Sequence, residues 1–238
     1  MNSLANLKIK LFADGAEKKQ ILKYMAMSCI RGFTTNPTLM RAAGVQDYEA
    51  FAHEILEVVT DKPISFEVFA DDFGEMERQA RKIAAWAKNV YVKIPVTNTK
   101  RQSSMPLVKR LTNSGVKINV TAVLTVNQVR DALIALGGGA PSVISVFAGR
   151  IADTGRDPVP IMAEAVKMAA AHPGIEVLWA SPRELLNVFE ANDVGCHIIT
   201  ATDAILSKLQ TVGKDLDEYS LETVLMFHND AARSNYQL

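Results

Sequence analysis

A lysine stands in the middle of a stretch that is otherwise typical of a buried strand. Residues 90–97 are rich in β-branched and apolar side chains, and Lys93 lies at their centre. Because burying an ammonium without a partner is costly, such a lysine is either paired or held neutral. A neutral lysine is a nucleophile that forms Schiff bases with carbonyl compounds. The stretch alone is equally compatible with a lysine at a strand end, its stem buried and its head in water.

Two carboxylates could assist this lysine. Asp14 follows one short apolar run and Glu67 lies within another. A lysine flanked by a carboxylate can attack a ketone, and the resulting iminium is an electron sink. A second carboxylate positioned over a substrate hydroxyl can remove its proton, so that a carbon–carbon bond breaks in the retro-aldol sense. These residue types therefore point to aldol chemistry, provided that the fold brings them together.

The spacing of apolar residues predicts the fold that must do so. Eight apolar or β-branched runs are separated by segments of helical spacing, and they cover residues 9–13, 30–34, 64–69, 90–96, 117–123, 142–147, 176–180 and 197–200. Helical patterns are clear at residues 47–59, 103–111, 127–136 and 158–170. Strands alternating with helices predict a parallel sheet, and eight units in 238 residues favour one (β/α)8 TIM barrel over residues 1–238. No GxGxxG motif follows the first run, which disfavours a dinucleotide-binding sheet.

The chain continues after the eighth run, and residues 214–238 form a predicted helical extension. Leu221, Val224, Leu225 and His228 follow helical spacing behind Ser220, a candidate N-cap. Because the barrel is complete before this helix begins, its apolar stripe must pack on the outside of the barrel or on another subunit. The sequence leaves both arrangements open.

Bulk composition excludes several classes of function. The charges balance, with 26 basic and 26 acidic residues, so no global field attracts nucleic acid or an anionic membrane. Residues 1–10 lack the pattern of a signal peptide and no apolar run is long enough to span a membrane, so we expect a cytoplasmic protein. Cys29 and Cys196 are isolated and are expected to be buried thiols. The four histidines have no metal-ligand spacing, so no metal site is expected.

Polar residues recur where the predicted strands end, which is where the chemistry of a (β/α)8 barrel is located. Ser181 and Arg183 follow the seventh run, in a region where such barrels commonly bind phosphate, and a guanidinium can hold a phosphate through two hydrogen bonds. A surface salt bridge is the alternative for Arg183. The candidate site residues are Asp14, Thr34, Asn36, Glu67, Lys93, Asn119, Thr121, Ser145, Phe147, Arg150, Ser181 and Arg183.

These strand-end motifs resemble the transaldolase family, Schiff-base enzymes built on a (β/α)8 barrel. The most specific matches are Thr-Thr-Asn-Pro at residues 34–37 and Lys-Ile-Pro-Val-Thr at residues 93–97. Together the matching segments cover nearly the whole predicted barrel, at residues 12–14, 32–38, 66–68, 92–97, 119–121, 145–151 and 180–183.

The resemblance implies a role for each site residue. Lys93 is the implied Schiff-base lysine, Asp14 the base for carbon–carbon cleavage, and Glu67 acts with Thr121 through a water on the carbinolamine and imine steps. The remaining roles are to hold the hydroxyls of the three-carbon fragment, with Thr34, Asn36, Asn119 and Ser145, and to hold the distal phosphate, with Arg150, Ser181 and Arg183. No metal or organic cofactor is implied.

A sister branch of this family, the fructose-6-phosphate aldolases, releases dihydroxyacetone instead of transferring it. Those enzymes are short like this chain, but they carry glutamine in place of Glu67 and tyrosine in place of Phe147, and they lack an asparagine at the position of Asn119. At all three positions this sequence resembles the longer transaldolases, although it lacks their extra helices. The resemblance is therefore to a short transaldolase-like subgroup.

The implied reaction transfers a dihydroxyacetone unit from a ketose phosphate, of the fructose 6-phosphate or sedoheptulose 7-phosphate type, to an aldose phosphate in the pentose phosphate pathway. The alternatives are an aldolase-type lyase, a transaldolase acting on a sulfonated sugar, and a barrel that only binds sugar phosphates. The resemblance also implies a homo-oligomer, a pentamer or decamer, in which the C-terminal helix reaches a neighbour.

Overall fold

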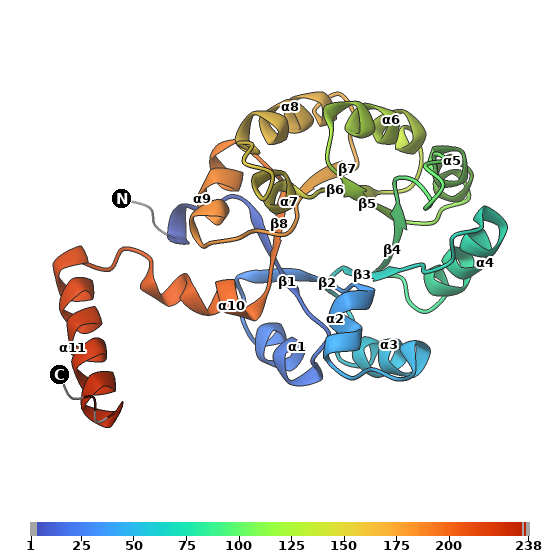
Figure 1. Cartoon of the computed structure of the whole chain (residues 1–238). Helices are drawn as coiled ribbons and strands as arrows, with labels where there is room; N and C mark the ends of the chain where they lie inside the picture. Colours follow the sequence, from blue (N-terminus) through green and yellow to red (C-terminus); the bar gives the residue numbers. More distant parts are fainter. Residues whose placement is uncertain (1–3, 235, 237–238) are drawn as a thin grey trace.

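The computed structural model describes residues 4–234 and 236, and it confirms the predicted (β/α)8 barrel with an additional C-terminal helix (Figure 1). Parallel strands close in sequence order, with β8 pairing β1. The strands are β1 (Lys10–Asp14), β2 (Ile30–Thr34), β3 (Ile64–Glu67), β4 (Val90–Pro95), β5 (Ile118–Val123), β6 (Ser142–Val146), β7 (Ile175–Trp179) and β8 (Ile198–Ala201). The predictions for residues 1–10 and 214–238 include residues 1–3, 235, 237 and 238, which lie outside the described residues.

Helices surround the strands on the outside of the barrel (Figure 1). Asp47 and Asp72 begin α3 and α4 by accepting a backbone N–H with their side chains, and Thr125 and Gln128 form a capping box at α6. The helices are η1 (Leu4–Asn6), α1 (Lys18–Met25), α2 (Pro37–Ala42), α3 (Tyr48–Leu56), α4 (Phe73–Ala84), α5 (Met105–Asn113), α6 (Val126–Leu136), α7 (Ala148–Ala152), α8 (Val159–Ala169), α9 (Leu186–Asp193), α10 (Asp203–Leu206), η2 (Ser207–Thr211) and α11 (Leu216–Ser234).

The interior of the barrel holds an apolar layer below the strand ends. Its members form a cluster separate from the larger core between strands and helices, and they are Phe12, Val143, Leu178, Ala180 and Ile198. Side chains two positions apart share one face of a strand. The residues two positions after Phe12, Val143 and Ile198 therefore also face inward, and they are Asp14, Ser145 and Thr200. The same alternation that fills the barrel presents polar side chains at its carboxyl end.

Gly32 makes room for the largest side chain of this interior layer. A Cβ atom at Gly32 would lie 2.5–2.7 Å from carbon atoms of the Phe12 ring, closer than packed atoms allow. Phe12 and Gly32 are paired in the register of β1 and β2. Because Gly32 has no side chain, the ring of Phe12 can occupy the interior of the barrel beneath the strand ends.

The observed strands agree with the predicted runs to within a few residues, and β3 shows why one of them is shorter. The run predicted over residues 64–69 ends as a strand at Glu67. The backbone N–H groups of Phe69 and Ala70 donate to the side-chain oxygen of Gln79 on α4 instead of a neighbouring strand, at 3.0 and 3.1 Å. The chain therefore leaves the sheet after Val68, whose N–H still donates to the carbonyl oxygen of Lys93 on β4 at 3.1 Å.

The C-terminal helix begins earlier than predicted and stands away from the barrel (Figure 1). The prediction of Ser220 as its N-cap is wrong, because the Asp215 carboxylate accepts the N–H groups of Asp217 and Glu218 at 2.9 and 3.1 Å. None of the residues from Leu216 to Ser234 is buried, and Leu221 and Leu225 are 53% and 50% exposed. Across the described residues, α11 included, the structure contains no helix with the length and apolar character needed to cross a membrane.

The two cysteines lie in different environments. Cys196 is buried as predicted, and its thiol donates to the carbonyl oxygens of Val177 and Ile198. The prediction of a buried thiol is wrong for Cys29, which is exposed in the turn before β2. No apolar periodicity covers that turn, and turns lie at the surface because their backbone groups need water.

Replacing Gly32 by alanine is expected to destabilise the fold. In a strand this change would otherwise stabilise slightly by restricting the unfolded chain, but here the methyl group collides with the Phe12 ring. We expect a loss of about 1–3 kcal/mol in the free energy of unfolding, measured by chemical denaturation. Gly15→Ala is the matched control, because its nearest neighbour would lie 3.5 Å from the new Cβ. Equal denaturation midpoints for the two variants would contradict the packing argument.

Candidate active site

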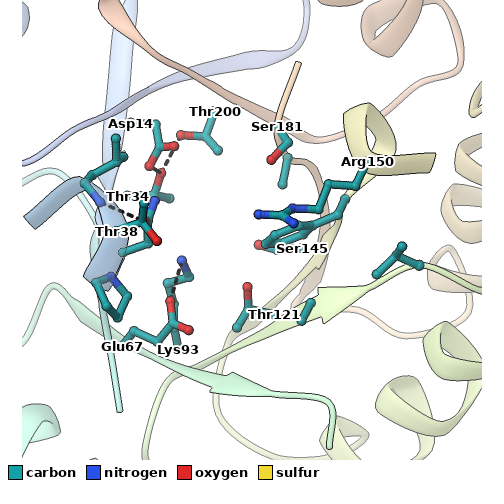
Figure 2. A pocket seen from close by; sticks show the side chains of 17 residues that line it. Asp14, Thr34, Thr38, Glu67, Lys93, Thr121, Ser145, Arg150, Ser181 and Thr200 are labelled. Atoms are coloured by element: carbon teal, nitrogen blue, oxygen red, sulfur yellow. Dashed lines mark hydrogen bonds and ion pairs between the residues drawn. The ribbon is translucent and has the colours of Figure 1, made fainter. Parts of the chain in front are cut away.

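A cavity of about 690 Å³ opens at the carboxyl ends of the strands (Figure 2). All but two of the predicted site residues line it, and those that do are Asp14, Thr34, Asn36, Glu67, Lys93, Thr121, Ser145, Phe147, Arg150 and Ser181. Other residues of the lining were not among those predicted, and they include Thr38, Ala122, Leu124 and Thr200. The exceptions among the predicted residues are Asn119 and Arg183, which lie outside the lining.

Lys93 is buried and paired, so the alternative of a lysine with its head in water is wrong. Its side chain is 7% exposed, and Nζ lies 3.0 Å from Oε2 of Glu67. The same ammonium donates to the carbonyl oxygen of Thr35 at 2.9 Å. Glu67 and Lys93 are register partners on β3 and β4, so the sheet itself places the carboxylate beside the amine. This arrangement offers an amine together with an acceptor for its proton.

Tyr48 on α3 fixes the backbone of Glu67. Its phenol oxygen accepts the N–H of Glu67 at 2.8 Å and donates to the carbonyl oxygen of Glu67 at 2.9 Å. Burial raises the pKa of the Tyr48 phenol, so it remains a donor. From the sequence, Tyr48 was recognised only as part of the helical pattern at residues 47–59. The end of β3 is thus tied from outside the barrel at the residue that pairs with Lys93.

Asp14 lies opposite this pair and belongs to a chain of hydroxyl groups (Figure 2). The hydroxyl of Thr34 donates to Oδ1 of Asp14 at 2.7 Å, and it also lies 2.6 Å from the hydroxyl of Thr200. Burial raises the pKa of the Asp14 carboxyl, while the charge of Lys93 and the hydrogen bond from Thr34 lower it and Glu67 raises it further. Because the net direction is upward, Asp14 is a stronger base than an exposed aspartate.

Thr200 was missed although one signal could have found it. It is the last residue of the run predicted over residues 197–200, and it is a polar residue at the end of an apolar strand, as the other site residues are. The structure places its side chain in the cavity lining with 4% exposure. A systematic reading of all eight strand ends would therefore have included it.

Asn119 lies beneath the cavity and supports one of its walls. It is 1% exposed, accepts the hydroxyl of Ser145 at 2.7 Å and donates to the hydroxyl of Ser65 at 3.1 Å. The amide of Asn119 on β5 thus links Ser65 on β3 to Ser145 on β6. Its geometry in this structure holds Ser145 in place.

Thr121 and Ala122 form a strained corner of the lining. The Thr121 hydroxyl is buried and has no hydrogen-bond partner among the described residues. Ala122 has a φ of 60°, and the pairing of β5 with β6 shifts between Val120 and Val123. A left-handed conformation at a residue other than glycine costs about 1–3 kcal/mol and is found mostly at functional sites. Thr121 therefore presents an unpartnered hydroxyl in the cavity lining, directly before this bulge.

Asn36 is also held by a helix end. Its side-chain oxygen accepts the N–H of Leu39 at 2.9 Å and so caps α2. The proline that follows occupies the first helical position, where a missing N–H is tolerated. The Thr-Thr-Asn-Pro motif therefore encodes both the start of α2 and the placement of Asn36 in the lining.

The far side of the cavity carries positive charge. Arg150, on α7, lines the cavity, and its guanidinium lies 5.7 Å from the centre of the Phe147 ring. Arg183 instead pairs with Asp153, with Nε 2.8 Å from Oδ1 and a second N–H donating to Oδ2. This guanidinium lowers the pKa of the Asp153 carboxyl. The surface salt bridge considered for Arg183 is thus the arrangement observed.

Gly149 allows α7 to approach this end of the cavity. A Cβ at Gly149 would lie 1.6 Å from the carbonyl oxygen of Ser181, a residue whose φ is 58°. The N–H of Gly149 donates to the carbonyl oxygen of Ala180 at 3.3 Å. Only glycine permits this contact, which sets Arg150 beside Ser181. Within residues 4–234 and 236, no group of three or more His, Cys, Asp or Glu side chains is placed to hold a metal ion.

Comparison with known proteins identifies a family. A family model described as transaldolase/fructose-6-phosphate aldolase matches residues 11–237. A probable transaldolase of Methanococcus maripaludis is 38% identical over 203 residues, which cover 84% of this chain and 89% of that protein. A probable transaldolase of a Thermoanaerobacter species is 35% identical over 215 residues, covering 90% and 94% of the two chains.

Solved structures agree on the fold. The structure of KGPDC from Streptococcus mutans superposes with a TM-score of 0.54 at 12% identity, covering 82% of this chain and 88% of that one. At this identity the likeness concerns the barrel alone. The relatives in sequence, by contrast, extend over most of both chains and support an enzyme of the transaldolase type. The chain belongs to the transaldolase/fructose-6-phosphate aldolase family.

Proposed function

We propose that this protein is a transaldolase that transfers a dihydroxyacetone unit from a ketose phosphate to an aldose phosphate through a Schiff base on Lys93. The observation that carries the proposal is the buried Lys93–Glu67 pair, which shares a cavity with Asp14 and Arg150. A protein that only binds a sugar phosphate does not need a buried amine in its cavity. A buried ion pair also contributes little to stability. The pair supports chemistry on a carbonyl group.

The proposed reaction begins when Lys93 gives a proton to Glu67 and its amine attacks the ketone carbon of the donor. The carbinolamine loses water, with Glu67 and Thr121 handling the protons through a water molecule, and an iminium forms. Asp14 then removes the proton of the hydroxyl two carbons away. The bond between the hydroxyl-bearing carbon and the carbon next to the iminium carbon breaks, its electrons move toward the iminium to give an enamine, and an aldose phosphate leaves.

The enamine then attacks the aldehyde carbon of the acceptor, and protonated Asp14 returns its proton to the new alkoxide. Water hydrolyses the resulting iminium, which releases the product ketose and restores Lys93. Ser145, Asn36 and Thr34 supply the polar surface for the hydroxyls of the bound three-carbon unit, since all three line the cavity. Asn119 acts in this proposal by holding Ser145 from below.

Phe147 favours transfer over release of the three-carbon unit. The enamine must survive until an aldehyde arrives, and protonation of its carbon would end in free dihydroxyacetone. Phe147 lines the cavity and has no acidic proton to give, whereas a tyrosine hydroxyl could donate one or position a water that does. This feature of the lining supports transfer over the aldolase reaction.

The distal anion of the sugar is proposed to lie at Arg150 and Ser181. Arg183 lies near the same end of the cavity. Its Nε is beside Gly149, the neighbour of Arg150, at 3.3 Å from the position that a Cβ of residue 149 would take. It must exchange Asp153 for the anion in order to contribute, and an exposed ion pair is worth little enough to allow this. A phosphate and a sulfonate would both be accepted by these groups.

We further propose that α11 joins copies of this chain into a homo-oligomer larger than a dimer. The helix exposes Leu221, Val224 and Leu225, which are 53%, 58% and 50% exposed, and none of its residues is buried. A lone helix with an apolar stripe is not stable in water, and burial on a neighbour relieves this.

Lys93→Met is expected to abolish transfer while leaving the fold intact, because methionine resembles the stem of lysine and suits a buried position. The measurement combines transfer from fructose 6-phosphate to an aldose phosphate acceptor with borohydride trapping and mass spectrometry. Wild type should give an adduct on Lys93 and the variant none. Lys117→Met, on the same barrel but bonded to the carbonyl of Lys88 outside the cavity, is the matched control. Substantial activity in a folded Lys93→Met variant would refute the Schiff-base assignment.

Arg150→Ala and Arg183→Ala are each expected to raise KM for phosphorylated donors by roughly ten- to a hundredfold, as the loss of a charge-assisted hydrogen bond implies. Donors of the dihydroxyacetone type without phosphate should be nearly unaffected. Arg156→Ala, an exposed arginine of the loop after α7, serves as the control. If either site variant loses equally on both kinds of donor, that arginine does not belong to the anion site.

Removing residues 216–238 is expected to convert the oligomer into smaller species without unfolding the barrel, because α11 has no residue buried against it. Light scattering gives the mass, and circular dichroism checks the fold. The double variant Leu221→Glu with Leu225→Glu should have the same effect, whereas Asp230→Asn on the same helix should have none. Full-length protein that is monomeric, or an assembly that survives the truncation, would contradict the proposal.

A further inference from the structure

Thr200 is a buried residue of the cavity lining whose hydroxyl lies 2.6 Å from that of Thr34. It lies in β8, and its strand pairs with β1, which carries Asp14. β1 in turn pairs with β2, where Thr34 is the register partner of Asp14. Three neighbouring strands therefore bring Thr200, Thr34 and Asp14 together at one edge of the cavity (Figure 2). Both threonines are buried, at 3% and 4% exposure.

The direction of the hydrogen bonds in this group follows from the proton count. A threonine hydroxyl has one proton, and an ionised carboxylate can only accept. The proton of Thr34 goes to Oδ1 of Asp14, across 2.7 Å. The contact of 2.6 Å between the two threonine oxygens must then be a bond from Thr200 to Thr34. The order is Thr200 to Thr34 to Asp14.

We propose that Thr200 is a positioning residue for the transaldol reaction: its hydroxyl holds the Thr34 hydroxyl in the orientation that donates to Oδ1 of Asp14, and it thereby leaves Oδ2 as the basic atom. The inference rests on the proposed function. A hydroxyl that accepts a hydrogen bond is a better donor, so the bond to Asp14 is strengthened by the presence of Thr200. Without it, Thr34 can rotate and donate elsewhere.

The charged groups that act on Asp14 come from the opposite side of the cavity. Lys93 on β4 favours the ionised carboxylate and Glu67 on β3 disfavours it, while Thr34 on β2 favours it through its hydrogen bond. A bond to the ionised form lowers a pKa, so weakening it raises the pKa of Asp14. Because the base must be ionised to accept the substrate proton, the acid limb of the activity profile then moves to higher pH.

Thr200→Val removes the donor with little change of shape, and Thr200→Ser restores it. We expect Thr200→Val to lower kcat by about five- to tenfold, with KM changed much less, since one buried hydrogen bond is lost. The acid limb of its kcat profile should lie at higher pH than that of wild type, and Thr200→Ser should match wild type in both. Thr200→Ala should reproduce the shift if valine is poorly tolerated. Thr112→Val, a buried threonine outside the cavity, is the matched control and should match wild type.

Borohydride trapping separates this inference from the function on which it rests. The imine forms on Lys93 before Asp14 acts, so Thr200→Val should still give the adduct. A wild-type protein without transfer activity or adduct refutes the proposed function itself. An active wild type with an unshifted Thr200→Val profile, a Thr200→Ser variant as impaired as Thr200→Val, or a similar loss in Thr112→Val refutes the role of Thr200 alone.

Discussion

The site depends on one buried ion pair, between the ammonium of Lys93 and the carboxylate of Glu67, 3.0 Å apart. Each charge that is taken out of water loses hydration worth on the order of several kcal/mol. The attraction between the two charges in a low-dielectric interior offsets this loss only when their geometry is good. The structure supplies that geometry through the sheet register, the carbonyl oxygen of Thr35 and the phenol of Tyr48. The rigidity of the barrel is therefore what keeps the buried amine of Lys93 beside the carboxylate of Glu67.

Alternation along the strands explains how one sequence pattern encodes both the barrel and its site. Phe12 and Asp14, or Val143 and Ser145, are neighbours on the same face, the first filling the interior and the second lining the cavity. This is why the fold and most lining residues could be predicted from the sequence. A period of two fixes the direction of each side chain once the strand is recognised, and the strand ends of a closed barrel meet in one place.

What could not be predicted depends on pairs that are distant in the sequence. Arg183 finds Asp153 thirty residues away, and Asn119 is placed beneath the lining by its bonds across β5. No local pattern distinguishes an arginine with such a partner from one without. The start of α11 was misplaced for a different reason, since both Asp215 and Ser220 are good N-cap residues and only the backbone decides between them.

The exposure of α11 links the stability of this helix to the binding of a partner surface. Helices that have no tertiary contacts are only marginally stable in water even at this length, and the 19 residues of α11 bury none of their side chains in their own chain. A surface that packs against Leu221, Val224 and Leu225 would therefore stabilise the helix. In the proposed oligomer, order in α11 and association of the chain form a single coupled equilibrium, in which protein concentration sets the helical content of α11.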